Sequence, residues 1–185
     1  MPTATISRPV PSDYPPYFAT YIDKVPDGDV IDLLKSQIED TVKTLSAVKE
    51  ADAGFRYAPG KWSIREVVGH VVDTERIFMY RAVCFARGET NPLPGFDEKV
   101  YAANSGSDAK PLSAHLDEFR TQRAATVSFL SGLAPEALLR RGTANNREYV
   151  MRAIPFIIAG HERHHMGVIR ERYLSRIGGR KVSRR

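Results

Sequence analysis

The chain has 185 residues, and 42% of them are apolar, which is enough for the hydrophobic core of one domain. Its single cysteine, Cys84, excludes an intramolecular disulfide, and no apolar run approaches the roughly 18 residues of a membrane span. Residues 172–185 hold six basic side chains and no acidic one, so the net charge of +5 is a property of this end rather than of a nucleic-acid-binding face.

Six of the twelve prolines fall within the first 26 residues, where a helix is therefore not expected. The same stretch is rich in aromatic side chains, so residues 1–28 are predicted to form an arm that packs on the body. The N-terminus lacks a charged start followed by an apolar run, which predicts no signal peptide and a cytoplasmic protein. The aromatic residues are Tyr14, Tyr17, Phe18 and Tyr21.

Four later segments place apolar residues three and four positions apart, the spacing of helices with one buried face. The second segment opens with Ser63-Ile64-Arg65-Glu66, a capping box in which the serine and glutamate side chains satisfy free backbone N–H groups. The expected helices span about Asp29–Lys49, Ser63–Arg87, Pro111–Ser131 and Val150–Ile177.

The connection over residues 88–110 is long for a bundle, and Asp97–Tyr101 could form a short helix within it. The alternating pattern of β-strands is nearly absent. We therefore predict an all-α fold: a four-helix bundle over residues 29–177 with a long crossover between the second and third helices, and a basic tail at 178–185.

Three histidines occupy apolar positions of two predicted helices. His161 and His165 are one helical turn apart and point the same way, and His70 lies on the apolar stripe of the second helix. Neutral imidazoles inside a bundle are costly unless their nitrogens have partners. A divalent transition metal with three protein ligands and one open position satisfies them, so His70, His161 and His165 are the candidate metal ligands.

Other residues near these positions are candidates for supporting roles. Asp73 and Glu162 could accept hydrogen bonds from the second ring nitrogen of a ligating histidine. His164 could line the mouth of the pocket or act as a base. We take His164, Glu162 and Asp73 as the candidate catalytic residues. Arginines could also meet an anionic substrate, or be solvated; they are Arg65, Arg76, Arg81 and Arg163.

His161-Glu162-Arg163-His164-His165 also matches H-E-x-x-H, the signature of zinc proteases. In those enzymes a third ligand lies downstream and the helix packs on a sheet. Here the one nearby acid, Glu171, lies off the ligand face, and no sheet is predicted. The motif is therefore interpreted as part of the three-histidine site.

Several sequence blocks resemble the DinB/YfiT-like superfamily. Residues Arg56–Glu66, His70 and Asp73–Arg76 are similar to its second-helix block, Pro94–Asp97 to its crossover, and Ile157–His165 to its fourth-helix block. The resemblance covers about residues 30–175.

This resemblance implies a four-helix bundle, often a homodimer, with a divalent metal on three histidines that map onto His70, His161 and His165. Described members include transferases that join a low-molecular-weight thiol, such as bacillithiol or mycothiol, to an electrophile, and members assigned as hydrolases. The expected metal is zinc or nickel, or otherwise iron, manganese or cobalt.

The leading hypothesis is a metal-dependent enzyme that transfers a thiol co-substrate to a small-molecule electrophile. One alternative is a hydrolase that uses metal-bound hydroxide, and another is a non-catalytic, stress-linked metal-binding bundle. Neither membrane nor nucleic acid is an expected partner.

Overall fold

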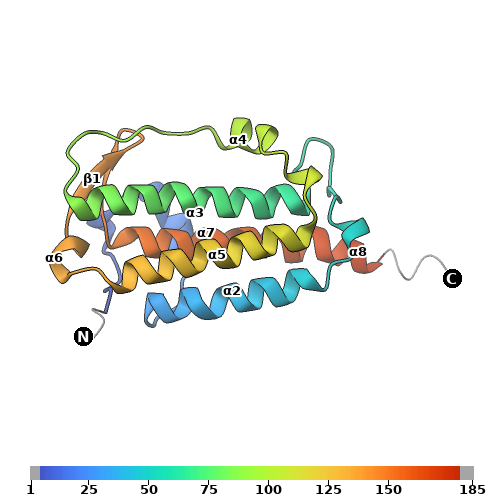
Figure 1. The fold of residues 1–185 in the computed structure, drawn as a ribbon, viewed down its shortest axis with the longest axis horizontal. Coiled ribbons are helices and arrows are strands. Elements are labelled where there is room, and N and C mark those ends of the chain that lie inside the picture. The colour runs from blue at the N-terminus through green and yellow to red at the C-terminus, as the bar shows by residue number, and fades with distance from the viewer. Residues whose placement is uncertain (1–4, 180–185) are drawn as a thin grey trace.

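The computed structural model describes residues 5–179 and shows four long helices side by side (Figure 1). An all-α four-helix bundle with a long crossover between its second and third long helices is thereby confirmed. Within the described range, no helix is both long and apolar enough to cross a membrane. The long helices are α2 (Val30–Ser46), α3 (Ile64–Arg87), α5 (Leu112–Ser131) and α7 (Ala153–Val168).

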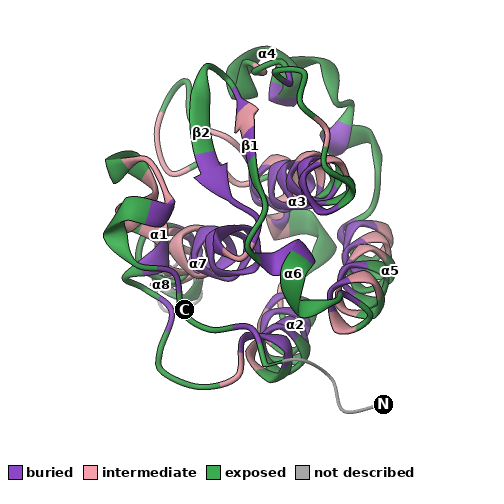
Figure 2. Cartoon of the chain, turned by 90° about the vertical axis from the view of Figure 1, so that its left-hand side faces the viewer, coloured by how far each residue is buried: buried purple, intermediate pink, exposed green. Residues whose placement is uncertain are grey.

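Local sequence signals set the helix ends. Asp29 accepts hydrogen bonds from the first turn of α2, and Ser63 and Glu66 form the predicted capping box of α3. Gly88, at φ +80°, ends α3 in a left-handed conformation that glycine adopts without strain. The helices turn their buried faces toward one another, as the end-on view shows (Figure 2).

The crossover from α3 to α5 carries α4 (Glu98–Asn104), which Asp97 caps. The short helix expected near residues 97–101 is therefore present. A single 3₁₀ turn (Ser107–Ala109) then leads into α5. Figure 1 shows α4 lying above the bundle, across one side of α3.

One element was not predicted: a β-hairpin of β1 (Arg141–Ala144) and β2 (Arg147–Val150), paired antiparallel. Each strand has only four residues, too few for an alternation of apolar and polar side chains to be recognised in the sequence. The turn residues Asn145 and Asn146 have φ of +51° and +58°, a conformation that asparagine tolerates better than most residues and that two-residue hairpins require.

The N-terminal arm is not free of helix, contrary to the expectation. Prolines at Pro11 and Pro16 begin two 3₁₀ turns, a position where the missing N–H costs nothing, and α1 (Ala19–Ile22) follows. The arm packs on the body: Asp13, 6% exposed, forms a 2.6 Å ion pair with Arg152.

The last long helix was expected to run without interruption from about Val150 to Ile177. Instead Val150 ends β2, and α7 passes into a π-helical segment (Ile169–Leu174) before α8 (Ser175–Gly179). The short α6 (Pro135–Leu138) connects α5 to the hairpin. Most of the basic tail predicted at 178–185 lies outside the described residues.

Gly160 lets α1 approach α7 closely. A Cβ atom on Gly160 would lie 2.1 Å from the backbone oxygen of Tyr21, far inside van der Waals contact. Backbone cannot move aside as a flexible side chain can. A glycine here is therefore needed for the arm to dock beside His161.

We expect Gly160→Ala to lower the free energy of unfolding by about 1–3 kcal/mol, because α1 must shift away from α7. Gly167→Ala on the same helix is the matched control, since no atom lies within 4 Å of its would-be Cβ. There alanine's helix propensity should leave stability unchanged or raise it by up to about 1 kcal/mol. Urea unfolding followed by circular dichroism measures both; equal effects in the two variants would contradict the tight α1–α7 contact.

Candidate metal centre

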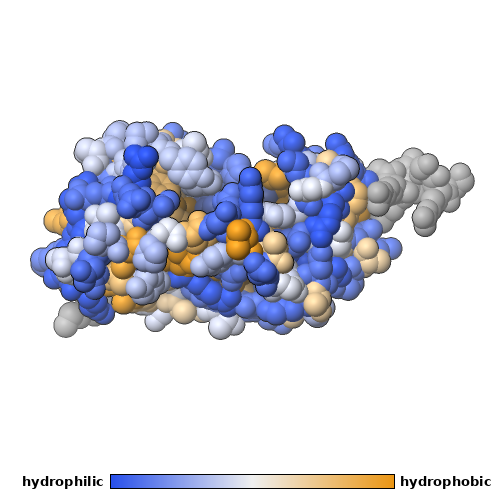
Figure 3. Space-filling model, turned by 90° about the horizontal axis from the view of Figure 1, so that it is seen from above, coloured by the Kyte–Doolittle hydropathy of each residue, from blue (hydrophilic) through white to orange (hydrophobic). Residues whose placement is uncertain are grey.

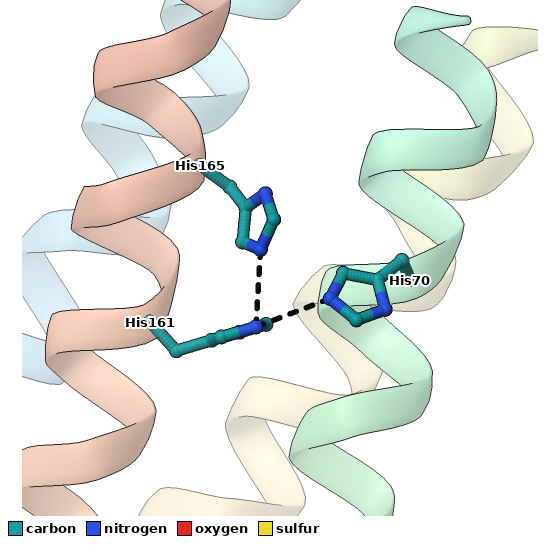
Figure 4. A group of neighbouring side chains, drawn as sticks. All are labelled: His70, His161 and His165. Carbon is teal, nitrogen blue, oxygen red and sulfur yellow. Dashed lines mark hydrogen bonds between the residues drawn. The ribbon is translucent and has the colours of Figure 1, made fainter. Parts of the chain in front are cut away.

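The structure brings His70 of α3 together with His161 and His165 of α7 (Figure 4). The Nε2 atom of His161 lies 3.2 Å from Nε2 of His70 and 3.1 Å from Nε2 of His165. One ring nitrogen from each residue lies within 4.8 Å of the other two. The one-turn spacing in α7 and the packing of α3 on α7 together produce this convergence.

Burial keeps the three imidazoles neutral. Burial lowers the pKa of His70 to about 4. Burial also lowers the pKa of His165 to about 3, and the neighbouring His70 and His164 add to this effect. The pKa of His161 is lowered well below its usual value, first by burial and then by the neighbouring histidines. At neutral pH each ring therefore has one nitrogen lone pair free to bind a cation.

The donor set fits a divalent transition metal. Three ring nitrogens facing one point cannot all be satisfied by one another, since each Nε2 offers either one proton or one lone pair. Zinc–nitrogen bonds of 2.0–2.1 Å in a tetrahedron put ligand nitrogens about 3.3 Å apart, close to the two short separations here. Three histidines also leave one position open, as in catalytic sites.

Asp73 does not accept a hydrogen bond from any of the three histidines, contrary to its expected supporting role. Its carboxylate pairs with Arg76 at 3.1 Å on the outer side of α3. Thr74 is the neighbour of His70 instead, with Oγ1 3.4 Å from Nδ1. Residues three and four positions on lie on opposite sides of His70 along the helix surface, and here Thr74 is on the buried side while Asp73 is on the side that reaches solvent.

Glu162 is also placed differently from the expectation. It follows His161 directly, so its side chain points about 100° round the helix, away from the histidines. There its carboxylate accepts hydrogen bonds from Gln37, Thr41 (2.6 Å) and Arg123 (2.8 Å). Glu162 is 1% exposed, which excludes direct contact with a substrate in this conformation.

Glu162 belongs to a buried ion cluster that sequence reasoning missed. Arg123 of α5 donates to Glu162 of α7 and, through two bonds of 3.0 and 2.9 Å, to Glu75 of α3. Thr126 completes the Glu75 site at 2.7 Å. A signal was present, because Glu75 and Arg123 are opposite charges at apolar-stripe positions of two helices.

His164 lies beside the cluster and is half-buried. Its ring centroid is 5.0 Å from that of His165 and 5.7 Å from that of Tyr21. Burial, helped by Lys24, lowers its pKa, so it is neutral near pH 7. A neutral imidazole at this position can accept a proton.

Aromatic residues surround the histidines on both sides. The Tyr21 ring meets His161 edge-on at 5.3 Å, and the Trp62 ring lies 4.8 Å from that of His70. Tyr173, from the π-helical segment, holds the Trp62 carbonyl with a 2.7 Å hydrogen bond. These contacts restrict how far the imidazoles can turn.

Two cavities reach the cluster. One, of about 650 Å³, is lined by His70 and His161 and by residues of the arm, α3, the crossover and the hairpin. The other, of about 440 Å³, is lined by His164 and His165 on the side of Trp62. Glu98 of α4 lines both. The histidines are thus accessible from two directions.

Comparison with known families supports the interpretation of these blocks. A family model described as the DinB superfamily matches residues 33–169. This range includes all three histidines of the cluster. Among curated proteins, no sequence matches the chain at a significant level.

Two solved structures share the fold. The first is YfiT from Bacillus subtilis, described as a probable metal-dependent hydrolase with an unusual four-helix bundle topology; it has a TM-score of 0.72, 20% identity, and coverage of 80% of this chain and 86% of that one. The second is a mycothiol-dependent maleylpyruvate isomerase, with a TM-score of 0.63, 15% identity, and coverage of 78% of this chain. This chain spans only 61% of the isomerase.

We expect Arg123→Met to lower the free energy of unfolding by about 3–5 kcal/mol, because it leaves two buried carboxylates without a counter-ion. Arg120→Met is the control: Arg120 is exposed on the same helix, and its pairs are long, at 3.8 and 4.0 Å. Its loss should cost less than about 0.5 kcal/mol. Adding Glu75→Gln and Glu162→Gln to Arg123→Met should recover much of the loss, and no recovery would contradict charge burial as the cause.

For the metal-free protein, we expect stability to fall as pH decreases from 7.5 to 5. The folded pKa values of His70 and His165 are near 4 and 3, whereas the unfolded value is about 6.5, so below pH 6.5 the unfolded chain binds protons that the folded chain does not. Each histidine then costs about 2 kcal/mol at pH 5. Urea unfolding in the presence of a chelator measures the free energy of unfolding at each pH. His165→Leu should lower the number of protons taken up on unfolding by one. An unchanged slope of stability against pH would contradict a buried, neutral His165.

Proposed function

The chain belongs to the DinB superfamily, and from that premise we propose that it is a divalent-metal-dependent enzyme that transfers a low-molecular-weight thiol to an electrophile. The observation that carries the proposal is the convergence of three neutral imidazoles, two buried and that of His165 partly buried, on one point between two cavities. The distant likeness to two metal- or thiol-dependent proteins is consistent with it.

His70, His161 and His165 would hold the metal through Nε2. A bound divalent metal supplies Lewis acidity, which lowers the pKa of a thiol or water molecule that reaches it. Thr74 Oγ1 lies 3.4 Å from Nδ1 of His70 and can accept a hydrogen bond from Nδ1–H, which is compatible with the tautomer that leaves Nε2 free. Trp62 and Tyr21 contact the rings of His70 and His161 and help to hold their orientation.

The two cavities favour transfer over hydrolysis. A transferase must bind two organic molecules at once, one on each side of the reacting centre. The cavity at His70 and His161 and the cavity at His164 and His165 provide two such volumes. Hydrolysis of one substrate needs only one of them.

The thiol must come from outside the chain. Cys84 is the protein's only cysteine, and it lies on α3 among residues that pack against the core, not in the wall of either cavity. His164 is the residue placed to accept the proton of an incoming thiol, because it is neutral and lines the second cavity beside His165. The sulfur then forms a bond to the electrophilic carbon, and the electron pair of the displaced bond leaves with the leaving group.

Homodimerisation and a cytoplasmic setting belong to the proposal as predictions from the sequence. A stress-linked binding role without catalysis is the alternative if the cluster binds metal but no turnover occurs. Hydrolysis is the alternative if turnover does not need a thiol.

The test combines metal analysis with thiol-dependent turnover. Protein purified without a metal column should contain about one transition metal per chain by elemental analysis, and His161→Ala should contain almost none. His115→Gln is the control, because His115 is buried away from the cluster and its Nε2 contacts the Ser107 carbonyl. Metal content should be retained there.

The same preparations are then assayed with chlorodinitrobenzene and a panel of low-molecular-weight thiols, and separately with an ester. Turnover that needs both metal and thiol supports the transferase. Ester turnover without thiol would overturn transfer in favour of hydrolysis. Absence of metal, with no uptake of zinc, nickel, iron, manganese or cobalt, would overturn the metal site itself.

A further inference from the structure

The larger cavity is built mainly from apolar and aromatic side chains. Phe78 of α3, Phe96 of the crossover, and Phe18 and Tyr21 of the arm form much of its wall. Figure 3, which looks onto the side of the crossover, shows hydrophobic surface set within mostly hydrophilic surroundings. An apolar ligand of drug-like size fits a volume of about 650 Å³.

Arg81 is the one deeply buried charged side chain among the described residues of this wall, whereas Glu98 and Arg147, which also line the cavity, are exposed. Its side chain projects from α3 and the residue is only 5% exposed, yet it lines the cavity. The guanidinium donates a hydrogen bond of 3.2 Å to the Pro94 carbonyl and also interacts with the phenol of Tyr149. It lies 5.3 Å from the centroid of the Phe78 ring and 5.9 Å from that of Phe96, which orient its plane.

Arg81 forms no ion pair with any carboxylate in residues 5–179. Guanidinium stays charged in proteins, and a buried charge is costly unless it is paired. Arg123, the other deeply buried arginine among the described residues, has two carboxylate partners. Glu98 lines the same cavity but is exposed on α4 and does not pair with Arg81. The missing counter-ion of Arg81 therefore points to a ligand.

We propose that this cavity binds an organic acid. Its carboxylate is held by Arg81, and its apolar part lies against Phe78 and Phe96. Because His70 and His161 line the same cavity, a ligand that extends from Arg81 along it would approach the histidine cluster. The inference rests on the proposed function and narrows it: the electrophile is an anion with an apolar body.

The probes are benzoate and phenylacetate, each compared with its uncharged amide, and binding is measured by calorimetry on the full-length protein as purified. Wild type should bind the carboxylates at least about tenfold more tightly than the amides, the usual value of a charge-assisted hydrogen bond. Arg81→Met should bind both forms equally weakly. Arg76→Met removes the same charge from the exposed side of α3 and should keep the preference.

A structural role for Arg81 predicts a different result. If Arg81 only stabilises the fold, Arg81→Met lowers the urea midpoint and leaves the carboxylate preference unchanged. The proposal instead predicts an unchanged or raised midpoint without ligand, because an unpaired buried charge has been removed, and loss of the stabilisation that benzoate confers on wild type. If Arg81→Met does not fold, Arg81→Lys is used instead. It keeps the positive charge but not the planar guanidinium that binds a carboxylate through two N–H groups, so it should lose most of the preference for acid over amide.

The outcomes separate this inference from the metal site. Equal binding of acid and amide by wild type, or a preference that survives in Arg81→Met or is undiminished in Arg81→Lys, would overturn the organic-acid assignment whatever the metal content. A preference that depends on Arg81 in protein without metal would uphold it and overturn only the proposed function. Metal content of Arg81→Met should equal that of wild type.

Discussion

Arg123 lies in the middle of the bundle and donates to two carboxylates that come from two other helices. Glu75 belongs to α3 and Glu162 to α7. The remaining long helix, α2, contributes Gln37 and Thr41 to the same cluster. Buried charges tolerate little displacement, because each loses its compensation when the partner moves. The cluster therefore sets the relative positions of all four long helices.

The histidine cluster depends on this arrangement. Glu162 follows His161 in sequence, so the ion cluster that holds Glu162 also sets the rotation of α7 that turns His161 toward α3.

The elements outside the four long helices do more than stabilise the bundle: they shape the way in to the histidine cluster. The arm, the crossover and the hairpin together wall the larger cavity. Gly160 allows the arm to lie close enough for Tyr21 to contact His161. The same walls bury Arg81 without a carboxylate partner. Its uncompensated positive charge therefore lies at a cavity that a ligand can enter.

The sequence by itself determined the helical class, the helix ends at Ser63 and Gly88, and the three histidines, because caps and one-turn spacing are local properties of the chain. Only the tertiary structure decided that Thr74 rather than Asp73 neighbours His70, that Glu162 turns into the core, and that Arg81 faces a cavity. Those outcomes depend on how helices far apart in sequence rotate and pack against one another. The hairpin belongs with them, since four-residue strands leave too short a pattern and are stabilised by packing on the bundle.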